Sequence, residues 1–275
     1  MRQLKISWSS LQNFEKCQVM GAKQLSRVKA PPQNVRHFFH GTVADSVMRA
    51  WLKSGAVPGT MPDLVDEILD REEQKVKDSQ SSKLVWKSRD DKGEVRDYVK
   101  RLSVGLEPFL LEKVVPYTFE SGKWLRVPFK IKSTNGFEPL EEAAEVTLIG
   151  ETDLFVTRED GYYCEYDLKA TQDKYYWKKC LGQHFFYALM IYGLHGVLPR
   201  EVGFIQPMCE QPYIPVDVTK DNVAELMQRV IRMANILYRD EAKFPEDMTH
   251  CNEWSCKYRP NCERFDLSAF GGTTI

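Results

Sequence analysis

The stretch from Gly150 to Lys169 reads GETDLFVTREDGYYCEYDLK and decides the fold. Apolar and polar residues alternate on both sides of residues 159–161, a pattern typical of two strands joined by a tight turn. If Gly161 takes the left-handed position of a three-residue loop, Asp153 falls directly opposite Asp167 in an antiparallel pair. Facing Cβ atoms would then lie ~4.5–5.5 Å apart, a separation that one divalent ion bridges.

Strict alternation predicts one acidic face and one apolar face for this strand pair. The acidic face carries Glu151, Asp153, Glu165, Asp167 and Lys169, and the apolar face carries Leu154, Val156, Tyr166 and Leu168. Four neighbouring carboxylates repel one another, so the face is costly unless a cation such as Mg²⁺ or Mn²⁺ neutralises it. The short pattern Asp-x-Lys also occurs on solvated strands that have no function.

The composition is that of an ordinary globular protein. The chain has 275 residues, of which 43% are hydrophobic and 28% charged, which excludes a disordered or low-complexity protein. Lys and Arg (38) nearly balance Asp and Glu (39), so any site for a polyanion must be a local patch. The longest nearly apolar stretch, 185–198, is shorter than the ~20 residues that span a bilayer. We expect an intracellular, cytoplasmic protein with no membrane partner.

The hydrophobic periodicity predicts a mixed α/β (α+β) fold in one domain, 1–275. Helices are expected at 10–17, over the region of 43–52, at 95–112, 174–194 and 221–238, with a helical insertion at 57–95. Strands are expected at 114–119, 124–131, 146–156, 162–168, 201–208 and 213–218. A cysteine-bearing tail at 240–267 follows the last helix.

Three of the seven cysteines are clustered near the end of the chain. Cys251, Cys256 and Cys262 follow the spacing C-x4-C-x5-C, and Cys17 is a distant fourth thiol. Four thiolates suit a [4Fe–4S] cluster or Zn²⁺. Reduced, unligated cysteines are the alternative, but this polar, proline-containing tail makes a poor core and needs a staple to stay folded.

Aromatic and basic residues alternate at 174–179, just before a helix that contains Gln183 and Tyr187. Rings interleaved with lysines stack bases and hold phosphates, although an aromatic helix start also often simply packs on a sheet. Gln183 and Tyr187 lie one turn apart on one helix face.

Together, these motifs resemble those of the PD-(D/E)xK nucleases, specifically the RecB-like exonucleases that include the CRISPR-adaptation exonucleases and the AddB nuclease domain. The resemblance extends from about residue 6 to residue 262. The matching motifs are Gly150-x-x-Asp153, Asp167-x-Lys169, Gln183-x-x-x-Tyr187, Ser7-x-Ser9-Ser10-Leu11-x-x-Phe14-x-x-Cys17 and Gly41-Thr42-x-x-Asp45.

The resemblance implies a restriction-endonuclease-like core, with a central mixed sheet between helices. It implies Mg²⁺ or Mn²⁺ held by Asp153, Asp167 and the Leu168 carbonyl, with Lys169 catalytic and with Gln183 and Tyr187 orienting the DNA or the attacking water. The family has histidine where this chain has Asp45, so either Asp45 or His40 is expected to take that place. The resemblance also favours a [4Fe–4S] cluster over zinc at Cys17, Cys251, Cys256 and Cys262, although the family spacing is usually C-x2-C-x5-C.

The function that these expectations favour is a metal-dependent DNA exonuclease that leaves 5′-phosphate ends. It would act on single strands or at ends in DNA recombination or repair, and a phage origin is open. The alternatives are a non-cleaving iron–sulfur binder of single-stranded DNA and a zinc-stapled interaction protein. Because the chain has no Walker-type Gly-x-x-x-x-Gly-Lys run, a helicase or recombinase would have to be a partner.

Overall fold

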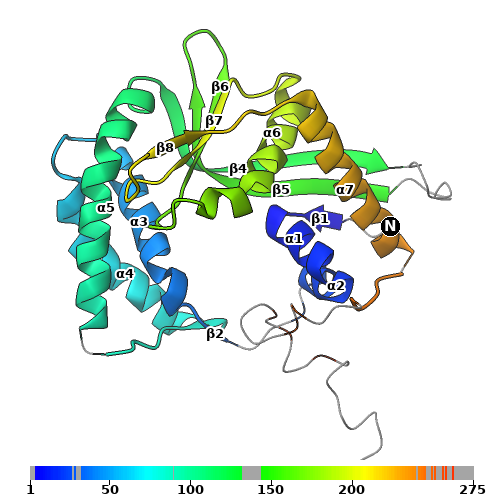
Figure 1. The fold of residues 1–275 in the computed structure, drawn as a ribbon, viewed down its shortest axis with the longest axis horizontal. Helices are drawn as coiled ribbons and strands as arrows, with labels where there is room; N and C mark the ends of the chain where they lie inside the picture. Colours follow the sequence, from blue (N-terminus) through cyan, green and yellow to red (C-terminus); the bar gives the residue numbers. More distant parts are fainter. Residues whose placement is uncertain are drawn as a thin grey trace, which may run out of the picture.

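A computed structural model describes residues 4–26, 28, 32–88, 90–131, 144–239, 241–245, 249, 251, 256, 258 and 262. These residues form a mixed α/β fold in which helices flank a central mixed sheet (Figure 1). The predicted fold class is therefore confirmed. Most of the predicted tail, 240–267, and the segment 132–143 lie outside the described residues.

The long strand β5 (Ala144–Thr157) is the centre of the six-stranded sheet. One of its edges pairs antiparallel with β4 (Thr118–Ile131) from end to end. Its other edge pairs first with β1 (Leu4–Ile6), in parallel, and then with β6 (Tyr163–Leu168), antiparallel. Between these two partners, residues 149–153 have no strand on that edge within the described part of the chain. The sheet continues through β7 (Glu201–Ile205) to β8 (Tyr213–Pro215).

Two hydrophobic clusters pack against the sheet. One contains residues of α3 (Arg36–Lys53), α4 (Val65–Asp78) and α5 (Asp91–Lys113), and the other contains residues of α1 (Trp8–Lys16), α6 (Leu181–His195) and α7 (Lys220–Tyr238). Shorter elements complete the order, namely α2 (Gln18–Leu25), β2 (Gln33–Asn34), β3 (Ser82–Lys83) and the 3₁₀ turns η1 (Met61–Leu64) and η2 (Tyr176–Lys179). None of the helices found among the described residues is long and apolar enough to span a membrane.

The turn between β5 and β6 has the predicted conformation. Gly161 has φ +79°, and the Gly161 N–H donates to the Arg158 carbonyl at 2.9 Å. The β5–β6 register runs from Thr157↔Tyr163 to Leu154↔Tyr166, so its next step places Asp153 opposite Asp167. The Leu168 N–H donates instead to the Asp153 carboxylate at 2.8 Å, which ends the β5–β6 ladder at this point.

The predicted apolar face is confirmed, because Leu154, Val156, Tyr166 and Leu168 all belong to the cluster that contains α3, α4 and α5 residues. The predicted acidic face is wrong for Glu151, because the alternation does not hold along the whole of β5. Leu148 packs with the α6 and α7 cluster, whereas Leu154 packs with the α3, α4 and α5 cluster, although both positions are even-numbered. The change occurs across Gly122 of β4, which has φ +68° and lies opposite Asp153, between the positions paired with Leu154 and Thr152. As a result Glu151 faces Arg49 of α3, while Glu165 faces His184 of α6, and the two acids do not share one face.

Several boundaries also differ from the predictions. The two strands expected at 114–119 and 124–131 are one strand, because the positive φ of Gly122 lets β4 continue without a turn. The pattern did not predict β1 or α2. The final helix is capped by Thr219 and Asn222, three residues before the capping turn expected at 222–225. The predicted insertion, 57–95, contributes buried Met61, Val65 and Ile68 to the core.

Candidate active site

Asp153, Asp167 and Lys169 meet where β6 leaves β5. The ammonium of Lys169 lies 2.5 Å from Asp167 Oδ2, and the side chain of Asp167 is 3% exposed. Asp153 uses one carboxylate oxygen to accept the Leu168 N–H, which fixes the main chain on which Asp167 and Lys169 stand. The strand pair thus holds two carboxylates and one ammonium in a single group, as the sequence predicts.

Helix α6 adds Gln183 and Tyr187 to this group. The Gln183 amide donates to Asp167 Oδ1 at 2.8 Å, and its carbonyl oxygen accepts from Lys169 Nζ at 3.1 Å. The Tyr187 hydroxyl donates to the Glu151 carbonyl at 2.7 Å and accepts from Gln183 at 3.3 Å. Gly150 permits this contact, because a Cβ there would lie 2.8 Å from the Tyr187 ring. The predicted pair on one helix face therefore locks Asp167 and Lys169 together.

The electrostatics of the group favour a bound cation. Burial raises the pKa of Asp153 well above its ordinary value, and the charges of Asp167 and Asp45 raise it further. Burial lowers the pKa of Lys169, but the nearby carboxylates of Asp167 and Asp153 outweigh it, and the net pKa is raised. Lys169 thus stays protonated, while burial favours the neutral form of Asp153, so a bound cation is what would stabilise its ionised form.

Asp45, rather than His40, joins the acidic group. The charge of Asp45 raises the pKa of Asp153, and burial raises the pKa of Asp45 itself. His40 turns elsewhere, since its Nε2 donates to the Ala170 carbonyl at 2.9 Å and its ring packs edge-on against Tyr98 at 5.2 Å. Of the two alternatives, the geometry places the aspartate near the acids.

Arg49 and His184 are site neighbours that the sequence patterns did not single out. Arg49 Nε lies 2.9 Å from Asp45 Oδ1 and 2.8 Å from Oδ2, and Nη1 pairs with Glu151. His184 and Glu165 form a fully buried pair beneath Asp167, in which burial raises the pKa of Glu165 and lowers that of His184 to about 4. These two pKa shifts favour a neutral Glu165 carboxyl beside a neutral His184 imidazole. The only sequence signal was that His184 lies between Gln183 and the first residue of the apolar run 185–198.

The donor set fits a hard divalent cation in its chemistry. Carboxylate and carbonyl oxygens suit Mg²⁺ and Mn²⁺, and Asp153, Asp167 and Asp45 supply the carboxylates. Within the described ranges, no group of three or more His, Cys, Asp and Glu side chains is already arranged as a metal site. The ammonium of Lys169 pairs with Asp167, and the guanidinium of Arg49 pairs with Asp45. The Leu168 carbonyl as a ligand stays a prediction.

Three of the four cysteines predicted as ligands, Cys17, Cys256 and Cys262, lie near one another. The four predicted ligands are half-buried. Burial raises the pKa of Cys17, and the charges of Cys256 and Cys262 raise it further, so these three lie within electrostatic range. Thiol donors fit an iron–sulfur cluster or zinc. Cys251 as the fourth ligand stays a prediction.

The predicted aromatic and basic patch follows the active strand. Tyr175 and Tyr176 are 55% and 40% exposed, and Lys178 lies 4.8 Å from the Tyr175 ring centre. The patch leads into α6 through Cys180, whose pKa is raised by burial. Exposed rings beside lysines are therefore present where the sequence placed them.

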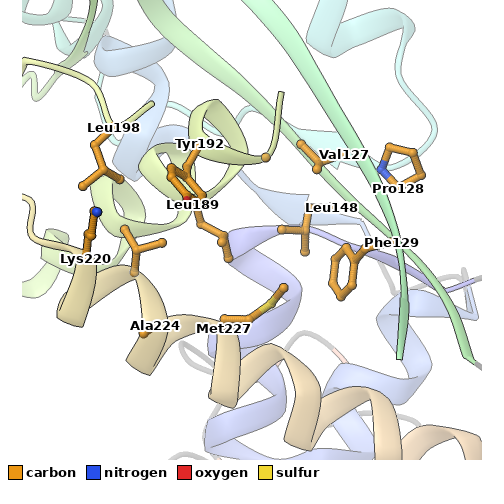
Figure 2. A pocket seen from close by; sticks show the side chains of 12 residues that line it. Val127, Pro128, Phe129, Leu148, Leu189, Tyr192, Leu198, Lys220, Ala224 and Met227 are labelled. Atoms are coloured by element: carbon orange, nitrogen blue, oxygen red, sulfur yellow. The ribbon is translucent and has the colours of Figure 1, made fainter. Parts of the chain in front are cut away.

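A separate cavity of about 480 Å³ lies among β4, α6 and α7. Its lining is mostly apolar, with Tyr192 and Lys220 contributing polar side-chain groups, and Figure 2 shows the side chains around it. It contains no carboxylate, histidine or cysteine, so it has no group for hydrolytic chemistry.

No family model and no curated protein matches this chain. Among solved structures, the chain is similar to the crystal structure of SSO0001, with 11% identity and a TM-score of 0.36, over 93% of this chain and 95% of that one. A likeness at this level carries no argument, and the case for function rests on the site itself.

Proposed function

We propose that this protein is a metal-dependent DNA exonuclease of the PD-(D/E)xK, RecB-like kind. The observation that carries the proposal is the single hydrogen-bonded group of Asp153, Asp167, Lys169, Gln183 and Tyr187. Three different motifs of the sequence, on two strands and one helix, converge there. A merely solvated acidic hairpin would not need buried acids or a helix that holds its lysine.

The proposed metal ligands are Asp153, Asp167 and the Leu168 carbonyl, with Asp45 as the third carboxylate. When bound, Mg²⁺ or Mn²⁺ would supply Lewis-acid chemistry, which favours attack of water on the phosphodiester. Asp153 and Asp167 would hold the cation, and Gln183 would keep Asp167 and Lys169 in register.

Lys169 would stabilise charge more than it would accept a proton. Its raised pKa leaves the ammonium protonated near neutral pH, so it is suited to the negative charge that develops on the scissile phosphate. Burial of the Lys169 and Asp167 side chains, 15% and 3% exposed, limits competing water.

The cysteines would serve the architecture. Cys17, Cys251, Cys256 and Cys262 would hold one [4Fe–4S] cluster, with zinc as the alternative occupant, and so tie the tail to α1 and α2. Such ligand energy is coupled to folding, so its loss would lower stability more than it alters the chemistry.

The proposed substrate is DNA that is single-stranded or is attacked at its ends, in the cytoplasm and in recombination or repair. The exposed rings and lysines at 174–179 support strand binding beside the site. A helicase or recombinase partner belongs to the same proposal.

The deciding experiment measures degradation of a 5′-labelled oligodeoxynucleotide with Mn²⁺, Mg²⁺ or EDTA, alongside anaerobic absorption spectra and metal analysis. We expect Mn²⁺-dependent release of nucleotides and broad visible absorption. Tight DNA binding without cleavage would favour the non-cleaving binder, and one zinc with no iron would favour the zinc staple.

A further inference from the structure

Arg49 is held from two sides at the edge of the acidic group. Its Nε contacts both carboxylate oxygens of Asp45, one turn earlier on α3, and its Nη1 pairs with Glu151 of β5. Within the described part of the chain its hydrogen bonds use Nε and Nη1, which leaves Nη2 without one. The side chain is 24% exposed, so part of it is accessible from solvent.

Gly122 creates the space that the guanidinium occupies. A Cβ at this position would lie 1.8 Å from Arg49 Nη1 and 2.8 Å from the Glu151 carboxylate. Gly122 also has φ +68°, a conformation that other residues rarely adopt. Position 122 of β4 therefore has neither a side chain nor a regular strand conformation, and the Arg49 guanidinium occupies the space beside it.

A simple ion pair between helix and sheet explains this arrangement poorly. Exposed ion pairs contribute little stability, and a lysine or a shorter side chain would leave room for an ordinary strand. A guanidinium fixed by two carboxylates has lost its rotational freedom in advance, and its planar fork matches phosphate oxygens. The neighbouring Trp124, directly opposite Glu151 in the β4–β5 register and 59% exposed, offers a ring for a base at the same edge.

We propose that Arg49 is a catalytic residue that binds a phosphate of the DNA strand at the acidic group, with Asp45 and Glu151 holding it and Gly122 making its space. This inference rests on the proposed nuclease function and adds to it the group that contacts the substrate phosphate opposite Lys169. Trp124 stacks the adjacent base.

The test uses kcat and KM for a single-stranded oligothymidylate in Mn²⁺, together with Mn²⁺ binding followed by electron paramagnetic resonance without DNA. We expect Arg49→Gln to lower kcat roughly 10²–10³-fold and to retain Mn²⁺ binding, because Asp153 and Asp167 are held by Leu168, Gln183 and Lys169 and do not depend on Arg49. Arg49→Lys should recover part of the loss. Trp124→Ala should raise KM and leave kcat nearly unchanged.

Gly122→Ala provides an independent route to the same defect. It should lower kcat as much as Arg49→Gln, and the double variant should be no worse than either single variant, since both remove one contact. Gly161→Ala is the matched control, because Gly161 has φ +79° with nothing within 4 Å of an added Cβ, so it carries the backbone strain without the clash. If Gly122→Ala does not fold, the comparison of Arg49→Gln with Arg49→Lys decides.

The inference is overturned if Arg49→Gln cleaves at the wild-type rate, or if it loses Mn²⁺ binding in proportion to cleavage. The second result would make Arg49 a support for the metal carboxylates. A wild-type protein that neither binds Mn²⁺ nor cleaves would overturn the proposed function and the inference with it, so the two failures are distinguishable.

Discussion

Gly150→Ala is expected to push α6 away from β5 and so to displace Gln183 and Tyr187, which α6 contributes to the site. The added Cβ would lie 2.8 Å from Tyr187 Cε1 and 3.4 Å from Met190 Sδ. Carbon atoms in contact prefer roughly 3.5–4.0 Å, so the ring would have to retreat by about 1 Å. It has little freedom to do so, because Tyr187 is 7% exposed and its hydroxyl is bonded to the Glu151 carbonyl at 2.7 Å.

Overpacking of this kind costs about 1–3 kcal/mol. At roughly 2–4 °C per kcal/mol for a domain of this size class, the melting temperature should fall by about 2–12 °C. Gln183 lies one turn before Tyr187, so its bond to Asp167 moves with the helix. A displacement of about 1 Å at a catalytic group lowers the rate about 100-fold.

Circular dichroism melts and Mn²⁺-dependent cleavage well below the melting temperature measure the two effects. Gly41→Ala is the control, because the nearest atom to its added Cβ, Ala170 Cβ, lies at 3.9 Å, and it should be neutral or stabilising by about 0.5–1 kcal/mol. If Gly150→Ala melts and cleaves like wild type, α6 does not hold the site through Tyr187.

Three further predictions concern the lysine, the staple and an ion pair far from the site. Lys169→Ala should slow single-turnover cleavage by ~10²–10³ while DNA affinity, measured by fluorescence anisotropy, changes little. Lys178→Ala should weaken DNA affinity while single-turnover cleavage of bound DNA changes little. Equal losses of DNA affinity and cleavage in Lys169→Ala would contradict a catalytic role for Lys169. Cys256→Ser should lower iron content, solubility and melting temperature together, so a colourless variant that melts like wild type would count against the staple. The hydrogen bond from Arg36 lowers the pKa of buried Asp91 to about 2. Because this pKa is lowered by folding, the pair stabilises the protein above the unfolded value near 3.8 and loses that effect as pH falls towards 2. Asp91→Asn should therefore destabilise by about 1–3 kcal/mol in urea titrations near neutral pH, and a deficit that persists at pH 2 would contradict this assignment.

The sequence predicted the parts of the site that depend on local geometry. The turn at Gly161 sets the register of Asp153 and Asp167, and helical spacing sets Gln183 and Tyr187, so neither needed knowledge of distant contacts. The amphipathic helices and the mixed α/β class followed from the same short-range periodicity.

The remaining features arise from contacts between distant segments. The reversal of faces along β5 depends on the positive φ of Gly122, which no periodicity of β5 itself reveals. Arg49 reaches Glu151 across more than a hundred positions of chain, and Glu165 finds His184 only once α6 packs on β6. Strands as short as β1 carry too few residues to show a period.

The central claim is that Asp153 and Asp167 bind a divalent cation with which this protein hydrolyses DNA. The most direct measurement compares Mn²⁺ binding and Mn²⁺-dependent oligonucleotide cleavage for wild type and Asp167→Asn, with circular dichroism melts to confirm that both are folded. We predict that the folded variant loses Mn²⁺ affinity and cleavage together, while wild type retains both. Cleavage by Asp167→Asn at the wild-type rate, or wild-type protein that is folded and inactive with every divalent ion, would contradict the claim.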